Sequence, residues 1–374
     1  MRPSILLPHR IALTRPPQLR CATTALKSLS SLTRNPARGQ LRSSPPSGSH
    51  LPTTSSAFTS PSFNRYFSTS TPSMVQVCFL GLGNMGGGMA ANLATKASLD
   101  APLIIWNRSD AKYAAFEGKP VTIAASLDEA VAKSDIIFSC VSNDAAISEL
   151  YEAALKIPDG VAGKVFAECS TIHPDTTRKL QSLANGAGAE FVAAPVFGAP
   201  AMAAAGALVF VLAGSKDGIA KITPYLDGVM GRLTIDLSDN ADVGTALKLK
   251  VIGNTVILGM VESLSEGHVL SEKSGLGTAN FEKFITAMFG MSPYLPYSKR
   301  LTTGDYVRDK PLFSADLALK DANHALSLAK EAGTTMPIVE IAAKHLVEAK
   351  EEVGSKSDIA SIYGSVRKNA GLPF

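Results

Sequence analysis

The chain has 374 residues and 45% of them are hydrophobic, so it can form two domains of ordinary size with real cores, and disorder throughout is excluded. Its net charge of +4 depends on residues 1–73, which contain eight Arg, one Lys and no Asp or Glu. The rest of the chain has 27 basic and 32 acidic residues, a charge of about −5, which argues against a nucleic-acid partner.

Residues 1–73 are rich in Arg, Ser, Thr and Pro and lack an apolar run long enough to cross a bilayer, which is typical of an organellar transit peptide. Arg65-Tyr66-Phe67-Ser68 resembles a mitochondrial processing site, so we expect the protein in the mitochondrial matrix. A disordered leader and initiation at Met74 are the alternatives. In each case this segment stays outside the fold, and we expect no membrane partner.

The four cysteines share no CxxC or Cys/His spacing. Cys21 lies in the leader, and Cys78, Cys140 and Cys169 each lie in an apolar run. We therefore expect these three to be buried thiols rather than disulfides or zinc ligands, and we expect no metal site.

Residues 75–93 have the pattern of a short buried strand, a glycine turn and the start of a helix. Three glycines occupy the G-x-G-x-x-G positions of a dinucleotide-binding fold. The first permits a tight turn, the second lets the backbone approach a pyrophosphate, and the third lets helix and strand pack closely. The helix N-terminus would then face the phosphates. The residues expected to contact the cofactor here are Gly81, Leu82, Gly83, Asn84, Met85 and Gly86.

A helix over 85–96 and an apolar strand over 103–106 follow, which gives the motif its strand–helix–strand context. An acidic residue at the end of this second strand would bind the ribose of NAD. The chain has Asn107, Arg108 and Ser109 there, and a guanidinium and a hydroxyl suit a 2′-phosphate, so the sequence favours NADP(H) over NAD. We interpret Asp110, just before the next helix, as a helix cap.

Further apolar runs at 136–141, 165–168, 191–194, 208–213 and 233–237 are spaced as in a doubly wound sheet. From residue 243 the pattern changes to one long helix reaching about 274, followed by helical segments at 281–288, 314–331 and 337–350. We therefore predict an α/β fold in which a Rossmann-type domain, residues 75–238, is joined by a long interdomain helix to an all-helical domain, residues 239–374.

Five motifs, taken together and in order, resemble one enzyme family. They are G-L-G-N-M-G-G-G-M-A-A-N-L at 81–93, Glu168-Cys169-Ser170-Thr171-Ile172-His173-Pro174, Ala193-Ala194-Pro195-Val196-Phe197-Gly198-Ala199, Lys250-Val251-Ile252-Gly253-Asn254, and Lys320-Asp321. Over residues 77–365 the chain is similar to the beta-hydroxyacid dehydrogenase family, which includes 3-hydroxyisobutyrate dehydrogenases, glyoxylate/succinic semialdehyde reductases and 6-phosphogluconate dehydrogenases.

Lys250 and Asn254 are four positions apart, so on a helix they lie on one face and can reach one ligand. The resemblance assigns Lys250 the role of proton donor or acceptor during hydride transfer and assigns Asn254 the orientation of substrate. Lys248 is the rival, but it lies on the opposite side of the helix and lacks an Asn four residues later. The segment Glu266-Gly267, similar to the family's helix, also places the catalytic lysine at 250.

The resemblance implies that Ser170 contacts a substrate carboxylate and that Thr171 lies near the nicotinamide; a helix cap before Pro174 is the alternative for both, and for Thr171 above all. It also places Lys320 near the nicotinamide ribose. Two further residues, after the fourth strand, are expected along the cofactor: Ser142 and Asn143. We interpret the histidines at 173, 268, 324 and 345 as structural or exposed.

The substrate loop departs from the family pattern, which has an Asp at position 193 and Ser-Gly-Gly at 197–199. This chain has Ala193, Phe197, Gly198 and Ala199. Gly198 and nearby amides can still bind an anion. Phe197 is expected to make the pocket narrower or more apolar; packing in the domain interface is the alternative.

These observations lead to one hypothesis. The chain is an NADP(H)-dependent oxidoreductase that interconverts a small carboxylate-bearing alcohol, such as a 3-hydroxyacid, and its aldehyde or ketone. The alternatives are a pyridine-nucleotide-binding sensor or pseudoenzyme and an imine reductase-like enzyme. The long apolar helix further predicts a homodimer or homotetramer, because it has more apolar surface than one small domain covers.

Overall fold

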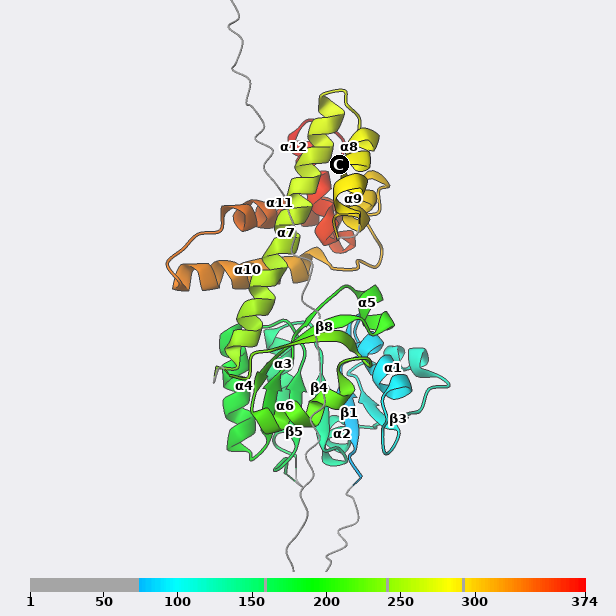
Figure 1. The fold of residues 1–374 in the computed structure, drawn as a ribbon, viewed down its shortest axis with the longest axis vertical. Helices are drawn as coiled ribbons and strands as arrows, with labels where there is room; N and C mark the ends of the chain where they lie inside the picture. The colour runs from blue at the N-terminus through cyan, green and yellow to red at the C-terminus, as the bar shows by residue number, and fades with distance from the viewer. Residues whose placement is uncertain (1–73, 158–159, 240–241, 291–292) are drawn as a thin grey trace, which may run out of the picture. The chain divides into compact units, whose positions relative to one another are not determined.

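A computed structural model of the protein describes residues 74–157, 160–239, 242–290 and 293–374. The predicted transit peptide, its processing site and Cys21 lie outside the described residues. The described chain forms an α/β domain followed by a helical domain, as the sequence predicts (Figure 1).

The sheet of the first domain has the order β3-β2-β1-β4-β5-β6-β8-β7, with β9 paired to β8. The first six strands pair in parallel, whereas β8 is antiparallel to β6 and β7 and parallel to β9. The strands are β1 (Val77–Leu80), β2 (Leu103–Trp106), β3 (Val121–Ile123), β4 (Ile136–Ser139), β5 (Val165–Glu168), β6 (Glu190–Ala193), β7 (Val196–Phe197), β8 (Leu208–Gly214) and β9 (Gly231–Asp236).

Helices cover both faces of this sheet, which explains why its central strands are continuously apolar. Along β1, Val77 and Phe79 belong to one hydrophobic cluster and Cys78 and Leu80 to the other. The helical elements of this domain are α1 (Gly86–Lys96), η1 (Asp110–Phe116), α2 (Leu127–Ala132), α3 (Asp144–Ala154), α4 (Pro174–Gly186), α5 (Pro200–Ala205), α6 (Lys216–Ile222) and η2 (Thr223–Tyr225).

Glycines set the close packing of α1. A Cβ at Gly86 would lie 2.1 Å from the carbonyl oxygen of Gly81, and one at Gly88 would lie 2.8 Å from the amide nitrogen of Ala204 in α5. Asn92 fixes the same contact, because its Nδ2 donates to the carbonyl oxygens of Ala203 at 2.7 Å and Ala204 at 3.1 Å. The glycine run therefore lets α1 lie against both the β1 turn and α5.

The second domain is built on the 30-residue helix α7 (Gly244–Lys273). Ala246 and Leu247, near its start, pack with the sheet, whereas Leu258 and Val261 belong to a third cluster formed by the helical domain (Figure 1). By length and composition alone α7 could cross a membrane, but 56% of its most apolar window is buried inside the protein. The remaining elements are α8 (Thr278–Phe289), α9 (Tyr294–Thr302), α10 (Ala315–Glu331), α11 (Pro337–Val353), η3 (Gly354–Lys356), η4 (Ile359–Ser361) and α12 (Ile362–Asn369).

One local expectation is wrong. Asp110 is not a cap, because Ser109 occupies the N-cap position of η1 and makes no side-chain capping bond, while Asp110 lies in the first turn.

Candidate active site

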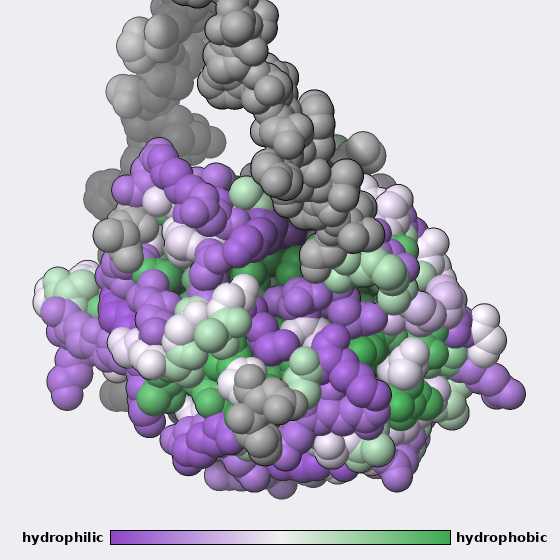
Figure 2. Space-filling model, turned by 90° about the horizontal axis from the view of Figure 1, so that it is seen from below, coloured by the Kyte–Doolittle hydropathy of each residue, from purple (hydrophilic) through white to green (hydrophobic). Residues whose placement is uncertain are grey.

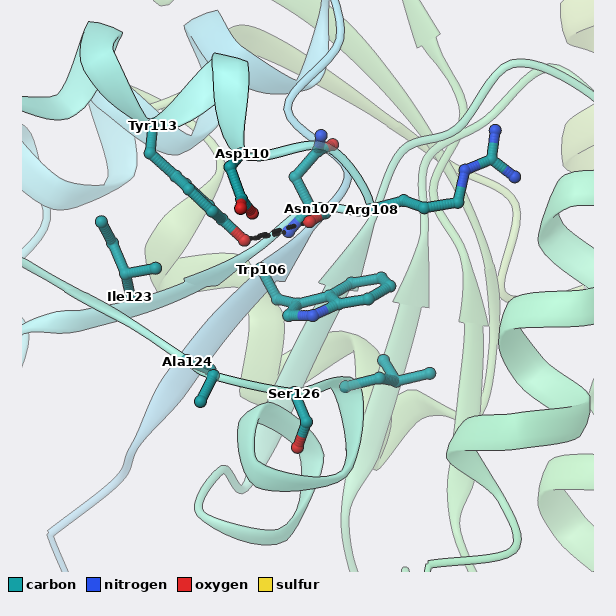
Figure 3. A pocket seen from close by; sticks show the side chains of 10 residues that line it. Trp106, Asn107, Arg108, Asp110, Tyr113, Ile123, Ala124 and Ser126 are labelled. Carbon is teal, nitrogen blue, oxygen red and sulfur yellow. Dashed lines mark hydrogen bonds between the residues drawn. The ribbon is translucent and has the colours of Figure 1, made fainter.

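A pocket of about 720 Å³ lies beside the end of β2 (Figure 3). Figure 3 shows the indole of Trp106 in this pocket and the Arg108 side chain extending away from Asp110 and Tyr113. The pocket is lined by Trp106, Asn107, Arg108, Asp110, Tyr113, Ile123, Ala124, Ala125, Ser126 and Leu127. The position after the second strand is where a dinucleotide fold binds the adenosine ribose, so this pocket fits that part of a cofactor.

Asn107 holds together the segments that line this pocket through hydrogen bonds. Its Oδ1 accepts from the Leu82 amide at 2.8 Å and its Nδ2 donates to the Ser109 carbonyl at 2.9 Å. The Tyr113 hydroxyl accepts from the Asn107 amide at 2.9 Å and donates to its carbonyl at 3.0 Å. Both ends of the Asn107 side chain and the Leu82 amide are thus engaged inside the protein, and their contact with cofactor stays a prediction.

The glycine turn has the features of a phosphate site. Met85 is the N-cap of α1 and makes no side-chain capping bond, and the first turn carries no acidic residue. A Cβ at Gly83 would meet nothing within 4 Å, so the space beside the turn is open. Gly83 and Asn84 are exposed there. An uncapped helix start beside open space fits a pyrophosphate, which the backbone amides and the helix dipole would hold.

Ser142 and Asn143 follow β4, next to this turn in the sheet. Asn143 caps α3, because its Oδ1 accepts from the Ala146 amide at 2.9 Å, while Ser142 is exposed. Neither observation tests the predicted cofactor contact.

A buried polar chain links α7 to α10. The Nζ of Lys250 donates to Oδ1 of Asn254 at 2.9 Å, and Nδ2 of Asn254 donates to Oδ2 of Asp321 at 2.6 Å. These residues are 6%, 9% and 3% exposed. Lys320 Nζ lies 3.4 Å from Oδ1 of Asp321 and donates to the carbonyl of Thr171. The helical spacing of Lys250 and Asn254 thus produces the adjacency that the sequence predicts, and Lys320 is not a solvated surface lysine.

Burial lowers the pKa of Lys250 to about 8. The Lys320 ammonium lowers that pKa further, whereas the Asp321 carboxylate and Cys140 raise it, against the larger effect of desolvation. Lys248, by contrast, is 44% exposed in its side chain and lies 3.2 Å from the Asp242 carboxylate. Lys250 is the buried lysine of the two, and its lowered pKa suits proton transfer near neutral pH.

Ser170 and Glu168 join the ends of β4 and β5. The Ser170 hydroxyl accepts from the Val141 amide at 2.8 Å, and the Ser170 amide donates to Oε1 of Glu168 at 2.7 Å. Ser170 is 2% exposed and Glu168 is fully buried. Burial raises the pKa of Glu168 to about 8, against the opposing effect of its bonds from Ser170. The observed partners of Ser170 are protein groups, so its contact with substrate stays a prediction.

The histidines of this region have structural partners. The N-cap of α4 is His173 and not Thr171, since Nδ1 of His173 accepts from the Asp175 amide at 3.2 Å. Nε2 of His324 lies 3.0 Å from Oδ2 of Asp144, which also accepts from the amide of His173 at its other oxygen. Burial opposes ionisation of Asp144, but its hydrogen bonds lower its pKa well below the usual range.

Phe197 lies at the end of β7 and is paired to Val209 of β8. Its ring centroid is 4.6 Å from the Nζ of Lys250. Gly198 has φ +145°, and a Cβ there would lie 2.5 Å from Leu208, so only glycine fits. Phe197 therefore packs from the first domain onto the interdomain helix α7, as the packing alternative expects, and its ring also lies against the candidate catalytic lysine.

The described cysteines are free thiols. Burial raises the pKa of Cys78 and of Cys140 to about 12 and also raises that of Cys169. A thiol with so high a pKa is a poor nucleophile, which agrees with their interpretation as small hydrophobic residues.

Two family models match the chain. Residues 76–237 match the NAD-binding domain of 6-phosphogluconate dehydrogenase, and residues 244–366 match the NAD-binding domain of NADP-dependent 3-hydroxyisobutyrate dehydrogenase. The two matches correspond to the sheet domain and the helical domain.

Individual relatives extend over most of the chain. An NADH-dependent oxidoreductase, ucdB, of Aspergillus ustus is 34% identical over 78% of this chain and 98% of its own length. The 2-(hydroxymethyl)glutarate dehydrogenase of Eubacterium barkeri is 29% identical over 72% of this chain and 87% of its own length. Among solved structures, 3-hydroxyisobutyrate dehydrogenase of Mycobacterium tuberculosis, with L-serine, is 25% identical, with a TM-score of 0.66 over 79% of this chain and 99% of that one.

Proposed function

Because the chain belongs to the beta-hydroxyacid dehydrogenase family, an NAD(P)-dependent class of oxidoreductases, we propose that it interconverts a small carboxylate-bearing alcohol and its aldehyde or ketone with NADP(H). The observation that carries this proposal is the buried chain formed by Lys250, Asn254 and Asp321. It supplies one amine, in a protected position, whose pKa suits proton transfer.

A bound nicotinamide cofactor would donate or accept the hydride, and the chain itself manages the proton. In reduction, the Lys250 ammonium gives a proton from Nζ to the oxygen of the substrate as it becomes a hydroxyl. In oxidation, the neutral amine takes that proton back. Asn254 fixes the amine through Oδ1, and Asp321 fixes Asn254, so the donor is held before substrate arrives.

The charge around this lysine favours an acid as substrate. Two ammonium groups, Lys250 and Lys320, lie near one carboxylate, Asp321, while burial keeps Glu168 protonated at neutral pH. The local excess of positive charge attracts a carboxylate. With NADPH as cofactor, we propose reduction of a small semialdehyde or oxoacid as the working direction, and oxidation of 3-hydroxyisobutyrate as the close alternative.

The first experiment is an activity panel. Small aldehydes, 2-oxoacids and 3-hydroxyacids are tested with NADPH or NADP⁺, comparing the wild type with Lys250→Ala and with the matched control Lys248→Ala, two residues along the same helix. We expect Lys250→Ala to lower kcat by about 10²-fold or more and Lys248→Ala to remain close to wild type. A fully active Lys250→Ala refutes the mechanism.

The same panel, extended to cyclic imines and to a ketone with an amine, separates the alternatives. Tight NADPH binding without turnover of any substrate supports a sensor or pseudoenzyme. Turnover confined to cyclic imines, or to a ketone with an amine, supports an imine reductase-like enzyme.

The preference for NADP(H) rests on Arg108 and Ser109, both exposed at the end of β2. The Aspergillus ustus relative is named for NADH, and Asp110 lines the same pocket, where a carboxylate would serve the ribose of NAD. Arg108→Ala and Asp110→Ala distinguish the two. If NADP(H) is preferred, Arg108→Ala raises KM for NADPH by about tenfold or more and leaves KM for NADH nearly unchanged. A wild type that prefers NADH overturns the assignment.

We also propose that a second copy of the chain covers the apolar side of the helical domain. Ile252 and Val256 of α7 are 55% and 67% exposed, and Ile338 and Ile341 of α11 are 61% and 46% exposed. By contrast, on the face of the first domain that Figure 2 shows, apolar residues form separate patches among hydrophilic ones, so we assign the contact between copies to the helical domain. Light scattering is expected to give a dimer or tetramer that Val256→Glu dissociates; a monomeric wild type refutes this.

Residues 1–73 are proposed to direct the protein to the mitochondrial matrix. Import of the full chain into isolated mitochondria, with cleavage near Ser68, is the expected result. A protein that stays outside, protease-sensitive and uncleaved, contradicts it.

A further inference from the structure

Phe197 and Gly253 fit each other across the approach of β7 to α7. A Cβ at Gly253 would lie 2.5 Å from both Cε1 and Cζ of the Phe197 ring, closer than real side chains allow. The ring can therefore occupy its position only because residue 253 is glycine. Glycine inside a helix costs roughly 1 kcal/mol relative to alanine, so its presence here calls for a packing reason.

The position of the ring places its face beside the Lys250 ammonium. The distance from Nζ to the ring centroid is 4.6 Å, within the roughly 6 Å over which an aromatic face attracts a cation. Gly253 and Lys250 are three positions apart on α7, so the helix presents both on one side. The same ring thus contacts the backbone of α7 and the charge of its buried lysine.

Other groups that act on Lys250 come from each neighbouring element. Asp321 and Lys320 belong to α10, Cys140 follows β4, and Asn254 is on α7 itself. None of these is changed by replacing Phe197, so the effect of the ring can be isolated.

We propose that Phe197 is a positioning residue which, seated on Gly253, holds the Lys250 side chain and stabilises its protonated form through the aromatic face. This inference deepens the proposed function and rests on it for its catalytic consequence. It also gives the altered substrate loop a purpose: the aromatic residue supports the proton donor, where the family's serine would offer a hydroxyl to substrate.

The test measures the pKa of Lys250 without turnover. The lysine ¹³Cε resonances are titrated by NMR, and Lys250 is assigned by the signal lost in Lys250→Met. Phe197→Leu, which keeps apolar bulk but removes the ring, is expected to lower the pKa of Lys250 by about 0.5 to 1 unit, the size of an ordinary cation–π interaction. If the reaction runs as proposed, kcat/KM for reduction at pH 9 then falls about three- to tenfold, while the value at pH 6 changes little.

Phe281 and Gly267 supply a matched control on the same helix. A Cβ at Gly267 would lie 2.5 Å from Cζ of Phe281, so the two contacts are alike, and the Phe281 ring meets His268 edge-on rather than a lysine. Phe281→Leu is expected to leave the Lys250 titration unchanged. An equal shift in Phe197→Leu and Phe281→Leu overturns the proposal, because it would reflect general loosening of the domain.

Gly253→Ala provides a second route to the same answer if Phe197→Leu folds poorly. Its methyl displaces the ring, so it should lower the pKa of Lys250 as Phe197→Leu does and add little in the double variant. Unchanged titration in the folded single variants refutes the role of Phe197, even if Lys250→Ala is inactive. Conversely, a shifted titration together with an active Lys250→Ala upholds the contact and refutes the proposed function alone.

Discussion

The buried carboxyl of Glu168 predicts a specific dependence of stability on pH. Burial raises the pKa of this group from 4.5 to about 8 in the folded protein. Between those pH values the folded state holds a proton that the unfolded state has lost, so the free energy of unfolding falls as pH rises. At about 1.4 kcal/mol per unit, the loss across this window is at most about 5 kcal/mol.

Glu168→Gln removes this titration and keeps the shape of the side chain. Oε1 of the glutamine still accepts from the Ser170 amide. Oε2 of Glu168 has no hydrogen-bond partner in the described structure, so the glutamine amide nitrogen would also lack one at that position. The resulting loss of folding free energy does not vary with pH. The stability difference between variant and wild type should therefore increase in favour of the variant from pH 5 to pH 8.

Urea unfolding followed by circular dichroism at pH 5, 6, 7 and 8 measures this difference. An increase of at least about 1.4 kcal/mol corresponds to a pKa raised by one unit or more. Glu117→Gln, at an exposed position, is the control and should give a flat difference. A flat difference for Glu168→Gln as well would show that this carboxyl is ionised in the folded protein, and the charge balance proposed for the site would be wrong.

Three further predictions follow from single contacts. Gly86→Ala places a methyl 2.1 Å from a backbone oxygen of the glycine turn, so we expect a thermal midpoint lower by several degrees and weaker NADPH binding by fluorescence titration. Asp321→Asn removes the carboxylate that raises the pKa of Lys250, so the alkaline fall of kcat/KM for reduction should move to lower pH; an unchanged profile contradicts the assignment. His324→Ala removes the 3.0 Å partner of Asp144 and should cost about 1 to 3 kcal/mol in urea unfolding, with a loss below 0.5 kcal/mol contradicting it.

The elements that can be predicted from the sequence are those whose local pattern fits only one type of secondary structure. Continuous apolar runs with polar boundaries give β2 (Leu103–Trp106) and β5 (Val165–Glu168) with their observed bounds, because both faces of the sheet are covered. The long segment without proline predicts a helix from residue 243 to about 274, and both ends of α7 lie within one residue of these positions. Propensity and packing agree in these segments.

The missed elements depend on distant partners. β3 has two exposed side chains, Thr122 and Ile123, so its short sequence lacks an apolar run. α12 contains Gly364, which weakens a helical pattern, but a Cβ there would lie 2.4 Å from the ring of Phe374. Gly364 therefore makes α12 hard to predict from the sequence, and it also leaves the space in which the Phe374 ring packs against this helix.

The candidate site divides in the same way. Helical spacing alone predicts that Lys250 lies beside Asn254 and faces away from Lys248. The hydrogen bond from Asn254 to Asp321 cannot be predicted in this way, because it forms only where α10 packs against α7. The hydrogen bond from the Val141 amide to the Ser170 hydroxyl likewise requires that β4 pairs with β5. For Asp321, the signal in the sequence is its place directly after Lys320 in the last of the five motifs.

The glycines of α7 show most clearly why sequence patterns reach a limit here. In a helix of 30 residues, Gly253, Gly259 and Gly267 look like weak points, because each lowers helix propensity by roughly 1 kcal/mol. The structure places a neighbouring side chain against each one: Phe197, Ile338 and Phe281 in turn. Their spacing therefore decides which side chains can reach the backbone of α7, and only at the first does the arriving ring also meet a buried ammonium. A position on α7 that lacks a side chain thus admits the ring that is proposed to adjust the proton chemistry of Lys250.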